Sequence, residues 1–392
     1  MKKTIVHLST YLQGGAGRII SDLITLQAGA GHEVTCVINQ TEYEGYQSYA
    51  EYKTSIAQHA TLYSVDNWFK RDMAGILDAA LSLKQILEPV PHCIVHSHAA
   101  VPAFAAQIAR GMLKADFPIV QTVHGWGLNK TAEQSAFDVN ILSSLDAVVA
   151  VSSVGRCQLI DLGVPEHLLS VIPNGICSAT AFTESSNPVA AKIKQIKSSH
   201  DCVIVCVGTL CERKAQSDLV AAVRKLRQKG VNVGCVLIGE CDNAYAKSLI
   251  EVVENDPVTH SAVYFLGCVD RAGEVLSEFD ALVSTSHSEG LPLAVLEAMR
   301  ESVPVILSDI PEHREVVTNA VTGWLFTHND INALSGCLET FLCLDAQVVS
   351  AVVTAAHTTY EQHYNSTGMY DAYEQLYGRL GSRTAASRSD SG

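Results

Sequence analysis

Short apolar runs alternate with longer stretches of helical period along the chain. Residues 4–9 (TIVHLS) form the first apolar run, and the glycine-rich loop YLQGGAGR follows it. A helical pattern then extends from Ile19 to Ala28, and a second apolar run extends from Glu33 to Ile38. This order of strand, glycine loop, helix and strand is typical of a doubly wound α/β sheet, in which ligands meet the carboxyl ends of the strands.

The first half of the chain continues with runs that predict further strands of the same sheet. They are Cys93–His98, Pro118–Gly125, Asp146–Ser152 and Leu169–Gly175. We therefore predict a first Rossmann-like domain at residues 1–178. A linker is expected at 179–200, because serine, threonine, asparagine and proline residues interrupt the periodicity there.

A second set of apolar runs follows the linker. These runs are Cys202–Gly208, Val233–Ile238, Val263–Leu266, Asp280–Ser284 and Val303–Leu307. Helical stretches separate them, so we predict a second parallel sheet in a domain at residues 201–361.

The end of the chain reads as helical from Asp330 to Leu380. Five tyrosines form a stripe on this stretch, and we assign the stripe to packing; they are Tyr360, Tyr364, Tyr370, Tyr373 and Tyr377. The polar residues 381–392 predict a disordered tail.

Length and charge narrow the possible functions. The 392 residues suffice for two domains with sizeable cores. A formal net charge of -14 and a pI near 5.5 argue against a nucleic-acid partner, which requires a basic surface. The N-terminal apolar run is too short for a signal peptide or a membrane anchor.

The twelve cysteines indicate the redox environment. Most lie inside apolar runs, as expected of reduced core residues in a cytosolic protein; examples are Cys36, Cys202, Cys206 and Cys235. The sequence contains no C-x2-C pair, so the cysteines do not predict a zinc site.

The stretch from Ser286 to Arg300 combines a strand end, a glycine and an apolar helix face. Pro292 fits a first helical position, so amide groups near Gly290–Leu293 are expected to point outward. Free amides and the helix dipole favour a phosphate. Because Glu289 and Glu297 would repel that anion, each is expected to accept hydrogen bonds from neutral hydroxyls, which sugars supply.

The glycine loop at the start of the chain does not match a nicotinamide site. Gly15 and Gly17 are followed by Ile20 where the dinucleotide motif has its third glycine. Asn39 follows the second strand, where that motif has an acid. Nicotinamide binding is therefore poorly supported.

Metal binding finds equally little support. His96 and His98 share one sheet face, but no third ligand lies at a suitable spacing, so we assign them to polar lining. Glu240 and Asp242 form an E-x-D pattern, and no D-x-D triplet occurs. We predict metal independence, no metal ligands and no cofactor.

The segments EGLPLAVLEAM and VPVILSDIPEHREVV resemble the E-x7-E region of the retaining GT-B glycosyltransferases of family 4. The resemblance implies two Rossmann-like domains with a cleft between them, and a C-terminal helix, at about 362–380, that crosses back to the first domain. It also implies that Glu289 contacts the donor sugar and that Glu297 holds the nucleotide ribose. The backbone of the residues between them would bind the distal phosphate; these are Gly290, Leu291, Pro292 and Leu293.

Two further matches lie in the first half. Gly14 and Gly15 resemble the paired glycines of the family, where a bare amide meets the donor phosphate or the acceptor. Arg18, one turn later, is expected to meet an anionic acceptor or to be an ordinary solvated surface residue. His124, in QTVHG, matches the family histidine beside the donor sugar. The alternative is a buried histidine whose ring nitrogens are hydrogen-bonded within the protein.

The segment GTLCERKA resembles the G-R-L-x-x-x-K-G signature, so Gly208 is expected at the sugar donor and Lys214 at its phosphate. The chain departs from this pattern at Thr209, which replaces the family arginine, and at Ala215, which replaces a glycine. Arg213 is expected to supply the missing guanidinium. Leu266 and its neighbours Phe265 and Gly267 resemble the segment that contacts the base.

The resemblance implies a retaining hexosyltransferase that takes a nucleotide sugar, with UDP- and GDP-sugars as the leading candidates. The acceptor would be a hydroxyl of a sugar or of a lipid-linked sugar, in surface polysaccharide or glycoconjugate synthesis. Two alternatives stay open: a GT-B nucleotide-sugar epimerase, and a catalytically silent nucleotide-sugar-binding protein. We expect a cytoplasmic protein, with peripheral association at the inner face of the membrane as an alternative.

Overall fold

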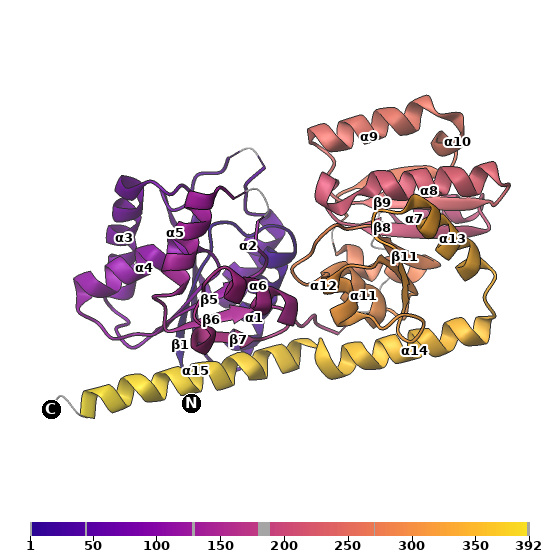
Figure 1. The fold of residues 1–392 in the computed structure, drawn as a ribbon. Coiled ribbons are helices and arrows are strands. Elements are labelled where there is room, and N and C mark those ends of the chain that lie inside the picture. The colour runs from indigo at the N-terminus through magenta and orange to yellow at the C-terminus, as the bar shows by residue number, and fades with distance from the viewer. Residues whose placement is uncertain (1, 44, 128–129, 179–188, 270, 390–392) are drawn as a thin grey trace. The chain divides into compact units, whose positions relative to one another are not determined.

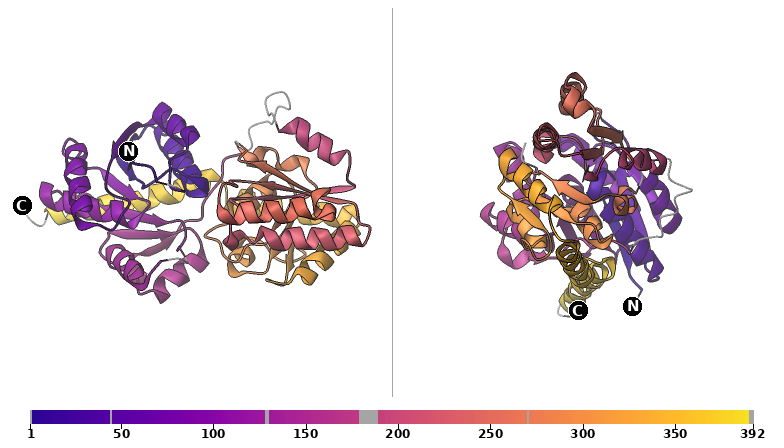
Figure 2. Two further views of the ribbon diagram at one scale, coloured as in Figure 1. Left: turned by 90° about the horizontal axis from the view of Figure 1, so that it is seen from above. Right: turned by 90° about the vertical axis from the view of Figure 1, so that its right-hand side faces the viewer.

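The chain folds into two units, each with its own parallel sheet (Figure 1). This computed structural model describes residues 2–43, 45–127, 130–178, 189–269 and 271–389, with side chains as far as Ser382. Unit 1 comprises Met1–Cys177 and Ser366–Gly392, and unit 2 comprises Ser178–Asn365. In each unit, helices cover both faces of the sheet (Figure 2), so the predicted doubly wound architecture is confirmed.

Unit 1 holds a seven-stranded sheet in the order β3-β2-β1-β4-β5-β6-β7. The strands are β1 (Thr4–Leu8), β2 (Glu33–Asn39), β3 (Thr61–Val65), β4 (Ile94–Ser97), β5 (Ile119–Val123), β6 (Ala147–Ala150) and β7 (Leu169–Val171). The helices are α1 (Gly14–Gly29), α2 (Ala50–His59), α3 (Met73–Leu87), α4 (Ala100–Leu113), α5 (Ala132–Leu142), α6 (Ser153–Asp161), η1 (Glu166–Leu168) and α15 (Ser366–Ser389).

Side chains alternate between the two faces of this sheet, as the period of a strand requires. Val6 and Leu8 of β1 join the core formed with α3 and α4. His7 points to the opposite face, where α1 and α15 lie against each other. The register pairs His7 with His96 on the neighbouring strand β4, so two histidines lie side by side on the α15 face.

The helix after β1 begins earlier than we predicted. We expected a loop through Arg18 and a helix from Ile19, but α1 begins at Gly14. Gly14 adopts a φ of +54°, which admits the turn into the helix. A Cβ on Gly17 would lie 2.5 Å from the carbonyl carbon of Leu12, so this glycine allows the helix to pack closely against the loop.

Unit 2 holds a six-stranded sheet in the order β10-β9-β8-β11-β12-β13. The strands are β8 (Cys202–Val207), β9 (Val233–Ile238), β10 (Val263–Gly267), β11 (Ala281–Ser284), β12 (Val305–Ser308) and β13 (Trp324–Phe326). The helices are α7 (Ala190–Lys197), η3 (Glu212–Lys214), α8 (Gln216–Gln228), α9 (Ala244–Asn255), α10 (Pro257–His260), η4 (Ala272–Glu274), η5 (Leu276–Glu278), α11 (Leu293–Arg300), α12 (Pro311–Val316), α13 (Ile331–Leu342) and α14 (Ala346–His363).

Two boundary predictions need correction. Part of the predicted linker 179–200 is helical, because α7 buries Ile193 and Ile196 within unit 2; residues 179–188 lie outside the described residues. The predicted disordered tail 381–392 is also partly wrong, since α15 continues to Ser389. The alanines and arginines near that end are good helix formers, a preference that our composition-based argument left out.

The chain returns from unit 2 to unit 1 between α14 and α15. α15 packs against α1 (Figure 1). Its residues Tyr373 and Tyr377 are buried. The tyrosine stripe therefore packs as predicted, although the hydroxyls of these two residues also form hydrogen bonds to the sheet.

Two further features concern the surroundings of the protein. Cys36, Cys202, Cys206 and Cys235 are buried as predicted, and all twelve cysteines are free thiols. Within the described ranges, no lone helix is long and apolar enough to span a bilayer. α13 and α14, bent by 111° at their junction, pass that test of length and composition only as a pair.

Candidate functional site

The ends of β8 and β9 in unit 2 approach each other through two glycines. A Cβ on Gly239 would lie 2.1 Å from the carbonyl oxygen of Gly208, so no other residue type fits there without a backbone shift. The Lys214 side chain lies against the other side of Gly208, where an added Cβ would be 3.3 Å from its Cε atom. Gly208, which we predicted at the sugar donor, thus lies beside the predicted phosphate-binding lysine.

The backbone after Lys214 turns sharply. Ala215 adopts a left-handed φ of +48°, a conformation that costs a non-glycine residue roughly 1–2 kcal/mol. The hydroxyl of buried Thr285 donates to the carbonyl oxygens of Lys214 and Ala215, both at 2.9 Å, and so holds this turn. The conformation explains why the family signature has a glycine where this chain has alanine.

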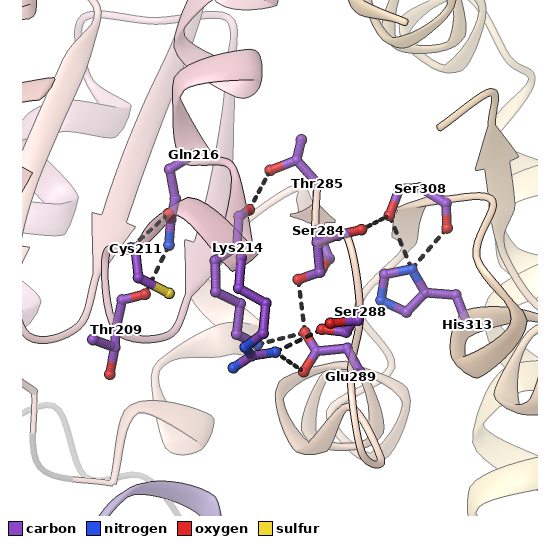
Figure 3. Close-up of polar contacts among 12 residues, drawn as sticks. Thr209, Cys211, Lys214, Gln216, Ser284, Thr285, Ser288, Glu289, Ser308 and His313 are labelled. Atoms are coloured by element: carbon purple, nitrogen blue, oxygen red, sulfur yellow. Dashed lines mark hydrogen bonds and ion pairs between the residues drawn. The ribbon is translucent and has the colours of Figure 1, made fainter. Parts of the chain in front are cut away.

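Glu289 lies at the centre of an ion cluster (Figure 3). Its Oε1 atom accepts from Lys214 Nζ at 2.5 Å and from Ser286 Oγ at 2.6 Å. Its Oε2 atom accepts from Arg213 Nη1 at 3.0 Å, and the same guanidinium donates to the carbonyl oxygen of Ser288 at 2.6 Å. Three residues from two segments of unit 2 therefore donate hydrogen bonds to one carboxylate.

The charges of this cluster explain the protonation state of Glu289. Burial alone would raise the pKa of the carboxyl group. The charges of Lys214 and Arg213, together with hydrogen bonds from Lys214 and Ser286, outweigh burial and lower the pKa of Glu289 to about 2. Two cations against one carboxylate leave the cluster with an excess of positive charge, which suits an additional anion.

The structure adds a contact that we did not predict. Lys214 and Arg213, which we expected at a phosphate, both bond to Glu289, which we expected at neutral hydroxyls. The expected roles of the three residues toward a ligand stay predictions. The three groups are close because Glu289 follows β11 and the cations follow β8, its neighbour in the sheet. The pairing spans about 75 positions along the chain, so the local sequence pattern gave no indication of it.

Helix α11 follows this cluster directly. It begins at Leu293, and Pro292 is its N-cap residue rather than its first helical residue as predicted. No side chain caps the helix, so its first amides depend on other acceptors. Leu291 and Pro292 are buried and Gly290 is half-buried.

Glu297, the second glutamate of the E-x7-E pattern, is 91% buried in the second turn of α11. Its carboxylate lies against Gly273, where a Cβ would be 2.6 Å from Glu297 Cδ. We did not predict a role for Gly273. A glycine in an unremarkable loop sequence gives no signal until the helix that packs on it is known.

Leu266 and Gly267 end β10, beside Gly239, which follows β9. A register shift between Phe265 and Gly267 interrupts the strand pairing, and the carbonyl oxygen of Gly267 accepts from Gly239 N at 2.9 Å. Leu266 is half-buried. The predicted base-contacting segment therefore lies at the same sheet edge as Gly208.

The predicted acceptor-side residues of unit 1 lie at the start of α1. Gly14 and Gly15 are exposed there. The Arg18 guanidinium bonds to Asp22 in the next turn of the same helix, at 3.1 Å. This contact favours the interpretation of Arg18 as a surface residue over that of an acceptor ligand.

His124 follows β5 and is hydrogen-bonded to another histidine. Its Nε2 atom lies 3.0 Å from Nδ1 of His98, and Nε2 of His98 lies 3.0 Å from Nδ1 of His7. Burial lowers the pKa of His124 and of His7 to about 4, and lowers that of His98 well below its ordinary value. These imidazoles are therefore neutral near pH 7.

His96 is a core residue, which corrects its assignment to polar lining. It is fully buried, and its two ring nitrogens bond to Thr122 at 2.8 Å and to Tyr377 at 2.7 Å. Its ring lies close to that of His98, with centroids 4.3 Å apart. We missed the part played by His7, although Ile5-Val6-His7 repeats the Ile94-Val95-His96 pattern of the partner strand.

Ring nitrogens of His7, His96 and His98 lie within 4.8 Å of one another, as three ligands of a metal ion could. The nitrogens of His96 are engaged with Thr122 and Tyr377, however, and those of His7 with Gln27 and His98. A metal ion here would have to break this network. Metal independence remains a prediction.

The sequence was compared with known families. A model described as Glycosyltransferase Family 4 matches residues 13–179, and a model described as Glycosyl transferases group 1 matches residues 190–347. The chain belongs to the GT-B glycosyltransferases of family 4. The proposed GT-B architecture is confirmed as well, since HepE of Anabaena, solved with UDP and glucose, superposes with a TM-score of 0.81. HepE is 18% identical, and the match covers 96% of this chain and 100% of HepE.

Two curated glycosyltransferases are similar over most of their length. N-acetyl-alpha-D-glucosaminyl L-malate synthase of Bacillus anthracis is 24% identical over 371 residues, which is 93% of each chain. UDP-Gal:alpha-D-GlcNAc-diphosphoundecaprenol alpha-1,3-galactosyltransferase of Escherichia coli is 24% identical over 314 residues, covering 77% of this chain and 79% of that protein. Residues 289–297 of this glycosyltransferase lie within the group 1 match, and His124 lies within the family 4 match.

Proposed function

We propose that this glycosyltransferase transfers a sugar from a nucleotide-sugar donor to a hydroxyl of an acceptor, with retention of the anomeric configuration and without a metal ion. The observation that carries the proposal is the cation pair Arg213 and Lys214 beside Glu289, immediately before helix α11. UDP-sugars and GDP-sugars are the donors we favour, and hexoses are the sugars.

The charge balance of the cluster supports this reaction. When the bond between sugar and nucleotide breaks, negative charge develops on the departing diphosphate. Lys214, Arg213 and the first amides of α11 can stabilise that charge, and a preorganised hydrogen-bond donor contributes roughly 3–4 kcal/mol in comparable sites. Because the protein supplies these positive charges, the reaction does not require a divalent cation.

Arg213 replaces the family arginine that is Thr209 in this chain. Its guanidinium reaches the carboxylate of Glu289 from the position before Lys214. A catalytically silent protein is the alternative that Thr209 suggests, and the placement of Arg213 argues against it.

The remaining residues are assigned to binding. Glu289 retains hydrogen-bonding capacity toward a hydroxyl of the donor sugar, since a carboxylate offers about four acceptor sites and three partners are present. Glu297 would hold the ribose, and Leu266 and Gly208 would contact the nucleotide. In unit 1, His124 would bind the donor sugar, and Gly14 and Gly15 the donor or the acceptor.

Retention follows from the family resemblance. We propose substitution on the same face of the anomeric carbon: the acceptor oxygen forms the new bond, the leaving phosphate departs, and the acceptor proton passes to that phosphate. The acceptor would be a sugar or a lipid-linked sugar of a surface polysaccharide or glycoconjugate. The sequence relationship to a galactosyltransferase named for a diphosphoundecaprenol acceptor supports a lipid-linked acceptor. Action in the cytoplasm, at the inner face of the membrane for a lipid-linked acceptor, fits this chemistry.

A panel of UDP- and GDP-sugars tests the proposal. The correct donor should raise the melting temperature by mass action, and transfer to a suitable acceptor should persist in EDTA. Lys214→Met should reduce kcat by 10²–10³-fold, the usual effect of losing one such donor. Lys229→Met, which removes an exposed lysine paired with Glu339, is the matched control and should leave kcat unchanged.

The other outcomes separate the rival functions. Full activity of Lys214→Met would refute the site. Donor binding without transfer across the acceptor panel would indicate a silent binding protein. Conversion of the donor in the absence of any acceptor would indicate an epimerase or a hydrolase.

A further inference from the structure

Unit 1 contains a row of hydrogen-bonded imidazoles that ends at His124. His7, His98 and His124 lie at the carboxyl ends of β1, β4 and β5, which are adjacent strands. Successive rings are joined by nitrogen-to-nitrogen distances of 3.0 Å. The far end of the row is the buried side chain of Gln27 in α1, whose Oε1 atom lies 2.7 Å from His7 Nε2.

The side-chain oxygen of Gln27 determines which ring nitrogens donate and which accept along this row. An amide oxygen only accepts, so the proton of neutral His7 must reside on Nε2. His7 Nδ1 then accepts from His98 Nε2, and His98 Nδ1 accepts from His124 Nε2. Each neutral imidazole carries one proton, so Nδ1 of His124 is left with a lone pair.

A second set of hydrogen bonds holds Gln27 in this orientation. Its Nε2 atom donates to the hydroxyl of Tyr377 at 3.4 Å, and that hydroxyl donates to His96 Nδ1 at 2.7 Å. His96 Nε2 in turn donates to Thr122, which is bonded to Tyr373 at 2.8 Å. With the Gln27 amide in this orientation, the Tyr377 hydroxyl accepts from Gln27 and donates to His96, so both of its hydrogen bonds are satisfied.

The Nδ1 atom of His124 is the open end of the row. It is buried and has no hydrogen-bond partner among the described residues. An unpaired buried acceptor costs roughly 1–3 kcal/mol, so the site favours a ligand or water that can donate a hydrogen bond to it. A sugar hydroxyl is such a donor.

We propose that Gln27, His7 and His98 are positioning residues that hold His124 in the tautomer with a bare Nδ1, and that this atom accepts a hydrogen bond from a sugar hydroxyl. The identity of the ligand rests on the proposed function, whereas the tautomer does not. Burial keeps the row neutral near pH 7, so His124 acts as a hydrogen-bond acceptor rather than as an imidazolium.

Ring ¹⁵N NMR on the full-length protein labelled at histidine tests the tautomer directly. At pH 7.5 we expect the His124 spectrum to show a protonated Nε2 and an unprotonated Nδ1, with assignment from the His124→Gln variant. A protonated Nδ1, or rapid exchange between both tautomers, would overturn the proposal. This measurement needs no sugar, so it stands even if the protein transfers none.

Substitution of Gln27 tests whether this side chain fixes the tautomer of His124. Gln27→Met removes the terminal acceptor, so His124 should populate both tautomers and the KM of the sugar donor should rise roughly fivefold to tenfold, with a smaller change in kcat. Gln27→Glu restores an acceptor and should restore the tautomer. His59→Gln, at the exposed end of α2, is the control and should change neither property.

The Gln27→Glu variant also predicts a change in pH dependence. A carboxylate beside His7 favours the imidazolium, so activity should fall at a higher pH on the acid side than in the wild type. The titratable and charged groups around the row are His7, His96, His98, His124, Tyr373 and Tyr377. Glu374 of α15 also lies on this side of the sheet, where it pairs with Lys3 and His32. A wild-type tautomer in Gln27→Met, or an unchanged acid limb in Gln27→Glu, would contradict the positioning role.

Discussion

The two units bury polar groups in opposite ways. Unit 1 holds a row of neutral imidazoles that runs from half-buried His124 to the buried amide of Gln27, and the direction of its hydrogen bonds orders it. Unit 2 gathers two cations around one carboxylate, and its order comes from charge. A neutral row can present a lone pair of defined direction, whereas a charged cluster attracts an anion from any direction.

Because of this difference, we expect the two units to lose stability in different pH ranges. Protonation of a buried neutral imidazole and protonation of a paired carboxylate both weaken the fold, but in different pH ranges. The contrast can therefore be tested without a substrate, by asking which unit loses stability first as the pH falls.

The largest expected effect is the acid sensitivity of unit 1. The pKa of His7 and of His124 is about 4 in the folded protein, against about 6.5 in an unfolded chain. Between these values the unfolded chain binds protons that the folded chain does not, so stability is complete above pH 6.5 and falls toward pH 4. Each fully shifted histidine contributes roughly 3 kcal/mol.

Hydrogen exchange followed by mass spectrometry, corrected for intrinsic rates, checks this at pH 7 and pH 5. Protection of β1, β4 and β5 should fall more than that of β8, β11 and β12. In unit 2, burial lowers the pKa of His313 as well, so a smaller loss is expected there. Equal losses in the two units would contradict the assignment of acid sensitivity to the histidine row.

The second prediction concerns the charged cluster. Glu289→Gln leaves Lys214 and Arg213 without their carboxylate and should destabilise unit 2 by roughly 3 kcal/mol at pH 7. Breaking one side of a buried ion pair costs about 3–5 kcal/mol, and we expect the lower end because solvent screens the exposed guanidinium of Arg213. Because the Glu289 pKa is lowered from 4.5 to about 2, the stability of the wild type falls through this pH window, and its advantage over the variant should vanish near pH 2.

Denaturant unfolding at a series of pH values measures this difference. Glu339→Gln removes a carboxylate from a surface pair with Lys229 and should cost less than about 1 kcal/mol at any pH. If Glu289→Gln were as stable as the wild type at pH 7, the cluster would be no more than a surface ion pair.

The same contrast shows what the sequence could predict. The local sequence pattern identified motif residues such as Lys214 and Glu289, and the apolar runs identified the parallel strands. The pattern did not predict the contact between Lys214 and Glu289, because that contact depends on β8 and β11 being neighbours in the sheet. Gln27 gave no signal at all, since a glutamine in a helix is ordinary until the imidazole beside it is known.

The smallest effect is expected for a substitution at Gly273, which changes neither the histidine row of unit 1 nor the ion cluster of unit 2. Gly273→Ala would place a Cβ 2.6 Å from Glu297 Cδ. The backbone there is ordinary, and the flexible carboxylate can move, so the melting temperature should change little.

Displacing Glu297 from a ribose hydroxyl would remove a charged hydrogen bond, worth about 1.5–3 kcal/mol, and so weaken nucleotide affinity about 10–100-fold. Calorimetric titration with nucleoside diphosphates measures this, with Gly336→Ala, where nothing lies within 4 Å of the added Cβ, as the control. Unchanged affinity would mean that Glu297 supports helix α11 and does not bind the nucleotide.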